Sequence, residues 1–245
     1  KGMGLVNDVF TAERLHSLPG DRAIGHVRYS TSGDTVATNA QPYLIECHRG
    51  PIAVGHNGNL VNAGILRREL EAAGSIFQST SDTEVILHLY ARSHRERVED
   101  AIAASLYKVM GAFSLLFLTP EALVAARDPW GFRPLVLGRL NGAAVVASET
   151  CALDLIDAEY VREVEPGEVL VADADGVRSF KPFPPEPTAH CIFEHVYFAR
   201  PDSLVFGRNV LESRLRLGRQ LAIEAPADAD VVCPVPDSGM GAALG

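Results

Sequence analysis

The chain has 245 residues, 47% of them hydrophobic, so it can bury a sizeable core in one large or about two small domains. Its net charge of −9 has the wrong sign for a surface that neutralises nucleic-acid phosphates, which argues against general nucleic-acid binding. The four cysteines lie far apart without a CxxC pair, so a disulfide scaffold is not indicated and a reducing cytoplasm fits best. No apolar stretch approaches the roughly 18–20 residues that span a bilayer, so we expect no membrane contact.

Three helices are predicted in the first half of the chain, over residues 63–73, 82–92 and 98–110. The second of them follows the spacing of a capping box. In that arrangement the Ser81 oxygen accepts a hydrogen bond from an amide at the helix start, and Glu84 reaches back to the cap.

Short apolar runs then predict five strands, separated by turn residues. The strands are expected over residues 112–118, 122–125, 134–137, 143–146 and 169–171. Their connections are too short for crossover helices, so neighbouring strands should run antiparallel. Helices followed by antiparallel strands favour a layered α+β fold.

A proline-rich segment over residues 181–187 predicts a domain boundary, because four prolines remove amide donors and fix the backbone. We predict one domain over residues 1–186 and the beginning of a second over 187–245. The second domain is expected to contain an apolar aromatic run over 191–199, a helix over 209–224 and a strand over 230–235.

Two charged residues could hold the two ends of an amino acid. An arginine can bind a carboxylate through two hydrogen bonds, and an aspartate can bind an ammonium group. Arg28 and Asp82 would together recognise a zwitterion. The alternatives are a surface salt bridge for Arg28 and an ordinary helix cap for Asp82, and on these residues alone the alternatives are favoured.

The dipeptide Asn57-Gly58 also has two interpretations. An asparagine amide beside an unhindered glycine N–H can donate two hydrogen bonds to the oxygen of a tetrahedral intermediate. Asn-Gly is equally a hairpin turn signal, and the pattern alone favours the turn.

Taken together and in order, eight segments resemble the amidophosphoribosyltransferases, over essentially the whole chain. These segments are HVRYST (26–31), HNGNLVN (56–62), SDTEV (81–85), DPWGFRPL (128–135), ASET (147–150), EVEPGE (163–168), VYFARPDS (196–203) and VPDS (235–238). The resemblance implies a glutaminase domain with the four-layer αββα sandwich of N-terminal-nucleophile, class-II glutamine amidotransferases. It also implies the start of an α/β type I phosphoribosyltransferase domain after it.

The activity implied by this resemblance is that of a glycosyltransferase of purine biosynthesis. Glutamine would be hydrolysed in the first domain, and its ammonia would convert phosphoribosyl pyrophosphate to 5-phosphoribosylamine in the second, with magnesium assisting. Members of the family form tetramers and are inhibited by purine nucleotides, so a homotetramer with these effectors is expected.

Site residues follow from the same resemblance. Arg28 and Thr31 are expected to bind glutamine, Arg28 through its α-carboxylate, and Asp82 is expected to bind its α-ammonium. Asn57 and Gly58 are expected to form the oxyanion hole. The combined match favours these roles over salt bridge, helix cap and turn.

In the second domain, Pro236, Asp237, Ser238 and Gly239 resemble the pyrophosphate loop, in which backbone amides can hold phosphate oxygens. Ser238 is expected to lie at or near the magnesium. Cys191 stands where some members place one of four cysteine ligands of a 4Fe-4S cluster, so one cluster is a further expectation.

One departure concerns the nucleophile, which in the family is a cysteine at the mature N-terminus activated by its own α-amine. This chain starts with Lys1, and its opening resembles a stretch well inside the family sequence. We therefore expect an internal fragment that catalyses neither half-reaction by itself. Two alternatives stay open: a non-catalytic glutamine- or nucleotide-binding module, and another class-II amidotransferase such as glucosamine-phosphate synthase.

Overall fold

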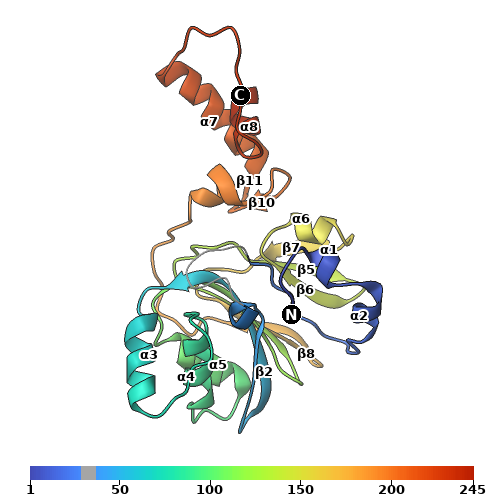
Figure 1. The fold of residues 1–245 in the computed structure, drawn as a ribbon, viewed down its shortest axis with the longest axis vertical. Helices are drawn as coiled ribbons and strands as arrows, with labels where there is room; N and C mark the ends of the chain where they lie inside the picture. The colour runs from blue at the N-terminus through green and yellow to red at the C-terminus, as the bar shows by residue number, and fades with distance from the viewer. Residues whose placement is uncertain (29–36) are drawn as a thin grey trace. The chain divides into compact units, whose positions relative to one another are not determined.

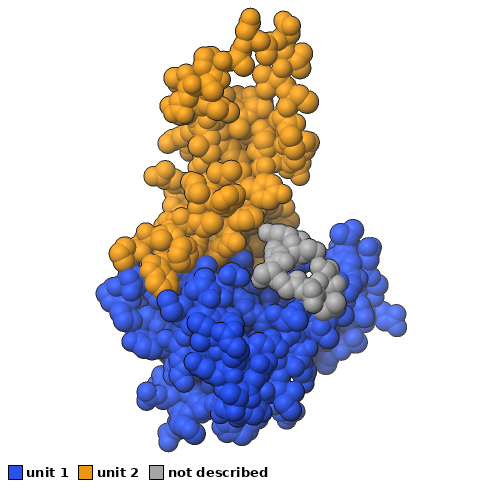
Figure 2. Space-filling view, turned by 60° about the vertical axis from the view of Figure 1, so that its left-hand side comes forward, with its two compact units in different colours: residues 1–129, 166–186 blue, residues 130–165, 187–245 orange. Residues whose placement is uncertain are grey.

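The chain is described by a computed structural model that covers residues 1–28 and 37–245. These residues gather into two compact units, coloured separately in Figure 2. Unit 1 comprises residues 1–129 and 166–186, and unit 2 comprises residues 130–165 and 187–245. The predicted boundary after residue 186 is one of three places where the chain passes between units, and the division into two domains stays a prediction.

Unit 1 contains a six-stranded sheet in the order β1-β2-β3-β4-β8-β9, with every neighbouring pair antiparallel. The strands are β1 (Tyr43–Cys47), β2 (Gly50–Leu60), β3 (Gly111–Leu118), β4 (Leu123–Arg127), β8 (Val169–Asp173) and β9 (Gly176–Phe180). β1 pairs with Gly50–Val54 of β2, whereas β3 pairs with Ala53–Leu60. The second half of β2 therefore has β3 along one edge and contacts from other segments along the opposite edge.

Three helices pack against this sheet: α3 (Ala63–Ala72), α4 (Glu84–Ala91) and α5 (Val98–Leu106) (Figure 1). They share one hydrophobic core with alternate residues of β2, because successive side chains of a strand point to opposite faces. Ile52 and Val54 of β2 are buried there with Ile86 of α4 and Ile102 of α5. The apolar spacing of the sequence predicted this helical layer.

The ends of these helices differ from prediction mainly at the start of α4, which begins at Glu84 instead of residue 82, and at the end of α5. α5 ends at Leu106 instead of residue 110, because the next residues turn into β3. The Asn62 side chain accepts a hydrogen bond from Met110 N and donates one to Lys108 O, so the backbone is satisfied outside the helix. Short helices also occur near the N-terminus, namely α1 (Val6–Val9), α2 (Ala12–His16) and the 3-10 turn η1 (Ala37–Asn39).

Unit 2 contains a three-stranded antiparallel sheet in the order β6-β5-β7, followed along the chain by a helical segment. The first part consists of β5 (Val136–Leu140), β6 (Ala143–Ala147), α6 (Cys151–Asp154) and β7 (Glu159–Glu163). The second part consists of the π-helix η2 (Glu194–Phe198), the hairpin β10 (Leu204–Val205) and β11 (Arg208–Asn209), α7 (Val210–Glu224) and α8 (Gly239–Leu244). Small separate cores form around Val136 with Leu153, and around Ala199 with Val210.

All five predicted strands are confirmed, as β3, β4, β5, β6 and β8, and every strand pair in the described residues is antiparallel. One expected neighbour relation is wrong, because β4 and β5 belong to different sheets. No helix in the described parts of the chain is long and apolar enough to cross a membrane.

The strand predicted over residues 230–235 is absent from the described structure. Val231, Val232 and Val235 are 78%, 73% and 79% exposed. A strand is stabilised by a hydrogen-bonded partner and by burial of its apolar side chains, and no described strand pairs with this segment. Its apolar composition alone is therefore not enough to form a strand here.

Candidate functional site

Asn57 and Gly58 lie inside β2, where they pair with Ser114 and Phe113 of β3. The hairpin-turn interpretation is therefore wrong: the dipeptide continues an 11-residue strand. The Asn57 side chain is half-buried and points to the sheet face opposite to that of His56, because neighbouring side chains of a strand alternate.

Gly58 is required by close packing. A Cβ atom at this position would lie 2.1 Å from the Ala112 carbonyl oxygen and 2.6 Å from His56 Nε2. Both distances are far below van der Waals contact, and one of the two atoms belongs to the backbone of the neighbouring strand. Gly58 therefore allows β2 and β3 to lie close together at this point.

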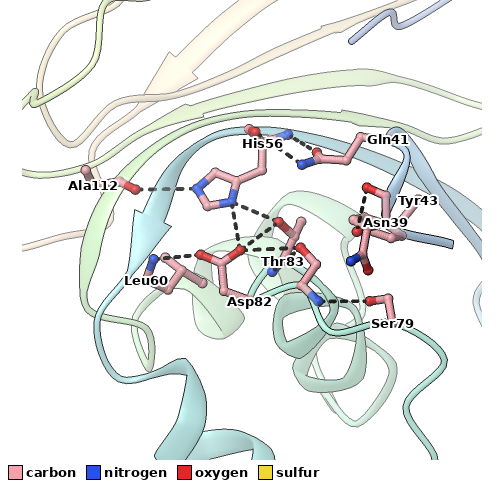
Figure 3. A network of polar contacts seen from close by, with 10 residues as sticks. Asn39, Gln41, Tyr43, His56, Leu60, Ser79, Asp82, Thr83 and Ala112 are labelled. Carbon is pink, nitrogen blue, oxygen red and sulfur yellow. Dashed lines mark hydrogen bonds and ion pairs between the residues drawn. The ribbon is translucent and has the colours of Figure 1, made fainter. Parts of the chain in front are cut away.

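The backbone of β2 presents an edge with several hydrogen-bond donors. On this edge the His56 N–H donates to Gln41 Oε1 at 2.7 Å, and the Leu60 N–H donates to Asp82 Oδ2 at 2.8 Å (Figure 3). Backbone N–H groups of an antiparallel strand alternate between its two edges. The Gly58 N–H therefore points to the same edge, between these two donors.

Asp82 lies at the end of this edge, and the helix-cap interpretation of it is wrong. The N-cap position of α4 is Thr83, and the Asp82 carboxylate instead accepts from Leu60 N. Its Oδ1 atom accepts from Thr83 Oγ1 at 3.3 Å and from Ser81 Oγ at 3.4 Å. A carboxylate has four lone-pair sites, so these contacts leave room for a ligand ammonium.

The predicted capping box is also wrong. Ser81 Oγ accepts from Thr83 N at 3.3 Å, one residue before the helix. The Glu84 carboxylate reaches further back, to Gln78 N at 2.7 Å and Ser79 N at 2.8 Å. Glu84 therefore stabilises the turn before α4 instead of capping the helix.

His56, directly before Asn57, is buried and joins the strand to the helical layer. Its Nδ1 lies 2.9 Å from Thr83 Oγ1 and 3.8 Å from Asp82 Oδ1, and its Nε2 lies 3.4 Å from Ala112 O. Because a carbonyl can only accept, Nε2 carries the hydrogen of that contact. No role for His56 was predicted, although its position in the HNGNLVN segment was a signal that could have indicated one.

Arg28 and His26 extend the site at the N-terminal side. A Cβ atom at Gly55 would lie 3.9 Å from His26 Cβ, so His26 lies beside β2. Burial, together with the positive potentials of His56 and Arg28, lowers the pKa of His26 to about 4. The half-buried Arg28 is thus close enough to act electrostatically on a residue that lies beside β2. Thr31 lies outside the described residues.

This pKa predicts a pH-dependent stability. In the unfolded chain a histidine titrates near 6.5, so between pH 6.5 and about 4 the unfolded chain binds a proton that the folded chain does not. Stability should therefore fall as the pH decreases through this window, and His26→Gln should make the fall shallower. Thermal unfolding of both proteins at half-unit pH steps measures this, and parallel profiles for the two would contradict it.

The second set of predicted site residues lies in unit 2. Pro236 and Asp237 are exposed, and Ser238 occupies the N-cap position of the six-residue helix α8, which starts at Gly239. Gly239 N donates to Val235 O at 3.2 Å, which closes the loop. The four residues thus form a tight, accessible turn at a helix start.

Metal-binding groups are sparse in the described residues. No group of three or more histidine, cysteine or acidic side chains is placed to hold a metal ion there. A 4Fe-4S cluster needs four ligands, and at Cys191 it stays a prediction. Mg²⁺ is usually bound through one or two protein oxygens and substrate phosphates, which the accessible Asp237 and Ser238 could provide.

Two further segments of the resemblance contact each other in unit 2. Glu149 Oε2 accepts from Arg200 N at 2.8 Å and from Ser203 Oγ at 2.7 Å. Thr150 Oγ1 accepts from Leu204 N at 2.8 Å. The Glu149 side chain therefore joins the ASET segment to the backbone of Arg200 and the hydroxyl of Ser203 in the VYFARPDS segment, contacts that their separation in sequence does not reveal.

Comparison with known proteins identifies the family. The glutamine amidotransferase domain matches residues 26–155, which include every residue of the candidate glutamine site. The chain belongs to this family. Sequence similarity to curated proteins also extends past that domain, over 100% of the chain.

Curated relatives of this amidotransferase chain are amidophosphoribosyltransferases. It is 57% identical to amidophosphoribosyltransferase 2, chloroplastic, of Arabidopsis thaliana, over 100% of this chain and 44% of the relative. It is 51% identical to the enzyme of Rhizobium etli, over 99% and 50%, and 46% identical to that of Methanocaldococcus jannaschii, over 100% and 56%. The chain therefore spans about half the length of the curated relatives it matches.

Solved structures confirm the fold class. The chain is similar to the glutamine phosphoribosylpyrophosphate amidotransferase from B. subtilis complexed with ADP and GMP, with a TM-score of 0.93 and 45% identity over 98% of this chain and 52% of that one. The allosteric regulatory enzyme of purine biosynthesis gives a TM-score of 0.94 and 46% identity over the same shares. This amidotransferase therefore has the class-II sandwich fold, followed by the beginning of a phosphoribosyltransferase domain.

Proposed function

We propose that the whole protein carrying this chain is an amidophosphoribosyltransferase. It hydrolyses glutamine and uses the ammonia to convert phosphoribosyl pyrophosphate to 5-phosphoribosylamine, with release of glutamate and pyrophosphate. The names of the relatives, and their similarity along the whole of this chain, support this reaction over that of glucosamine-phosphate synthase.

In the glutamine site, the Asn57 amide and the Gly58 N–H donate to the oxyanion, Asp82 binds the α-ammonium, and Arg28 with Thr31 binds the carboxylate end. The observation that carries this proposal is the edge of β2. The Gly58 N–H points to the edge on which Asp82 accepts from Leu60 N. An oxyanion donor and a counter-charge for an ammonium group thus lie within one short stretch of strand, as a substrate of glutamine's length requires.

In the second half-reaction, the loop of Pro236, Asp237, Ser238 and Gly239 binds pyrophosphate through backbone amides. Ser238 would hold magnesium at or near this loop, and the metal would neutralise charge on the phosphate oxygens. We also propose a homotetramer regulated by purine nucleotides, since the B. subtilis relative was solved with ADP and GMP. A cytoplasmic location remains a prediction, because the plant relatives are chloroplastic.

The test is a coupled assay of the whole protein. With phosphoribosyl pyrophosphate and magnesium present, glutamine should yield glutamate and phosphoribosylamine in equal amounts, and ammonium should replace glutamine in forming phosphoribosylamine. Calorimetry with glutamine under the same conditions separates the alternative. Binding of glutamine without release of glutamate would indicate the non-catalytic module and contradict the proposal.

A further inference from the structure

We propose that Asn39 is a positioning residue for glutamine, acting through the turn of residues 78–83 that presents Asp82. This inference rests on the proposed function of the glutamine site. Asn39 lies in η1, in the segment that follows Arg28 and Thr31 along the chain.

The turn that presents Asp82 is held mainly by side chains. It belongs to neither a helix nor a strand, so it has no regular backbone ladder of its own. Glu84 accepts from the backbone of Gln78 and Ser79, and Ser79 Oγ accepts from Ser81 N at 3.3 Å. The position of the Asp82 carboxylate therefore depends on these polar contacts, together with the hydrogen bonds that Leu60 N donates to its Oδ2 and Val85 N donates to its backbone oxygen.

Asn39 supplies a contact to this turn from a distant part of the chain. Its Oδ1 accepts from Thr80 N at 3.1 Å and its Nδ2 donates to Thr80 Oγ1 at 2.8 Å, across 41 residues of sequence. The side chain that makes this double contact is buried, since Asn39 is 1% exposed. Its own backbone is fixed to β1, because Tyr43 Oη donates to Asn39 O at 3.1 Å (Figure 3).

This arrangement joins the turn of Asp82, which is the ammonium end of the proposed glutamine site, to η1 and through it to β1. A double hydrogen bond fixes both the distance and the orientation of the turn, and a binding group must be held within about 0.5 Å of its productive position. Loss of the Asn39 contacts should therefore weaken glutamine binding while the oxyanion donors on β2 stay in place.

The experiment uses the whole protein with Asn39→Leu, which keeps the size of the side chain and removes both hydrogen bonds. The KM for glutamine should rise by about tenfold, because part of the free energy of the two lost hydrogen bonds then opposes binding, with kcat changed less than about threefold. Ammonium-dependent synthesis should be unchanged. Asn39→Asp keeps the acceptor for Thr80 N and can accept from the Thr80 hydroxyl, so it should restore most of the affinity.

A second ligand shows whether Asn39 acts through Asp82. Glutaramate is glutamine without its α-amine, so it cannot use the Asp82 carboxylate as a counter-charge. Its inhibition constant should be equal in wild type and Asn39→Leu. Equal weakening of both ligands, or an unchanged KM for glutamine, would overturn the inference.

Thr119→Val is the matched control. Thr119 is also buried and also contacts one residue twice, since its Oγ1 accepts from Ala122 N at 3.1 Å and donates to Ala122 O at 3.3 Å. Thr119 follows the end of β3 that is remote from Leu60, so Thr119→Val should leave the KM for glutamine unchanged.

If Asn39→Leu does not fold, the KM for glutamine is compared between Thr80→Val, which loses the hydroxyl that Asn39 binds, and Thr80→Ser, which keeps it. Thr80→Ser should bind glutamine normally. A wild-type protein that does not hydrolyse glutamine would instead reject the proposed function, and this inference with it.

Discussion

Replacing Asn57 by alanine in the whole protein should lower glutamine-dependent turnover by a factor on the order of 10²–10³, because loss of one oxyanion-hole donor typically has this effect. Ammonium-dependent formation of phosphoribosylamine should survive, since it bypasses the glutaminase reaction. The Asn57 side chain is half-buried on a strand that Ser114 and its neighbours hold in register, so the truncation should leave the backbone in place. Steady-state kinetics with glutamine and with ammonium measure the two effects separately.

Asn57→Asp separates hydrogen bonding from packing. The aspartate keeps the shape of the side chain and replaces the amide donor by a negatively charged acceptor, which should repel a developing oxyanion. It should therefore be at least as inactive with glutamine as Asn57→Ala, with ammonium-dependent activity again retained. Substantial glutamine-dependent turnover by Asn57→Asp would show that the side chain does not donate to the intermediate, and an equal loss of both activities would indicate a structural role.

The strands and helices that could be predicted from sequence are those whose apolar side chains are buried in a regular pattern. β3, β4 and β8 are central strands whose apolar runs are visible without any partner, and the amphipathic spacing of α5 has the same origin. β2 was missed because its second half carries His56, Asn57 and Asn59, whose polarity resembles a loop. The polar residues of β2 contribute to the candidate site, and only the tertiary structure shows that they belong to a strand.

The residues of the candidate site could be predicted from sequence, but the hydrogen bonds that hold them in place could not. The charges of Arg28 and Asp82, with the unhindered Gly58, indicated chemistry that sequence can suggest. The contacts that hold them come from elsewhere: Asn39 bonds to Thr80 across 41 residues. Local patterns even pointed the wrong way, since Glu84 has the spacing of a capping residue and instead holds the turn before Asp82. Side-chain contacts of this range depend on how strands and helices meet, which no local pattern encodes.

Gly58→Ala should destabilise the protein by at least about 3 kcal/mol, the upper part of the usual range for overpacking a close-packed interior. The added methyl group would collide with Ala112 O, at 2.1 Å, and with His56 Nε2, at 2.6 Å. Relief requires β2 and β3 to separate, because the Ala112 oxygen belongs to the partner backbone. For a unit of this size the melting temperature should fall by about 6–12 °C, which thermal unfolding measures directly.

Gly55→Ala in the same strand is the matched control. There, among the residues that the structure describes, a Cβ atom would meet His26 Cβ at 3.9 Å and His26 Nδ1 at 4.0 Å, which are ordinary contacts. Alanine in a strand also loses less backbone entropy on folding than glycine, so this change should be neutral or stabilising by up to about 1 kcal/mol. If both substitutions lowered the melting temperature equally, the cost would come from altering β2 in general. A loss confined to Gly58→Ala would instead show that the strand pair closes tightly at the point where the Gly58 N–H points to the site.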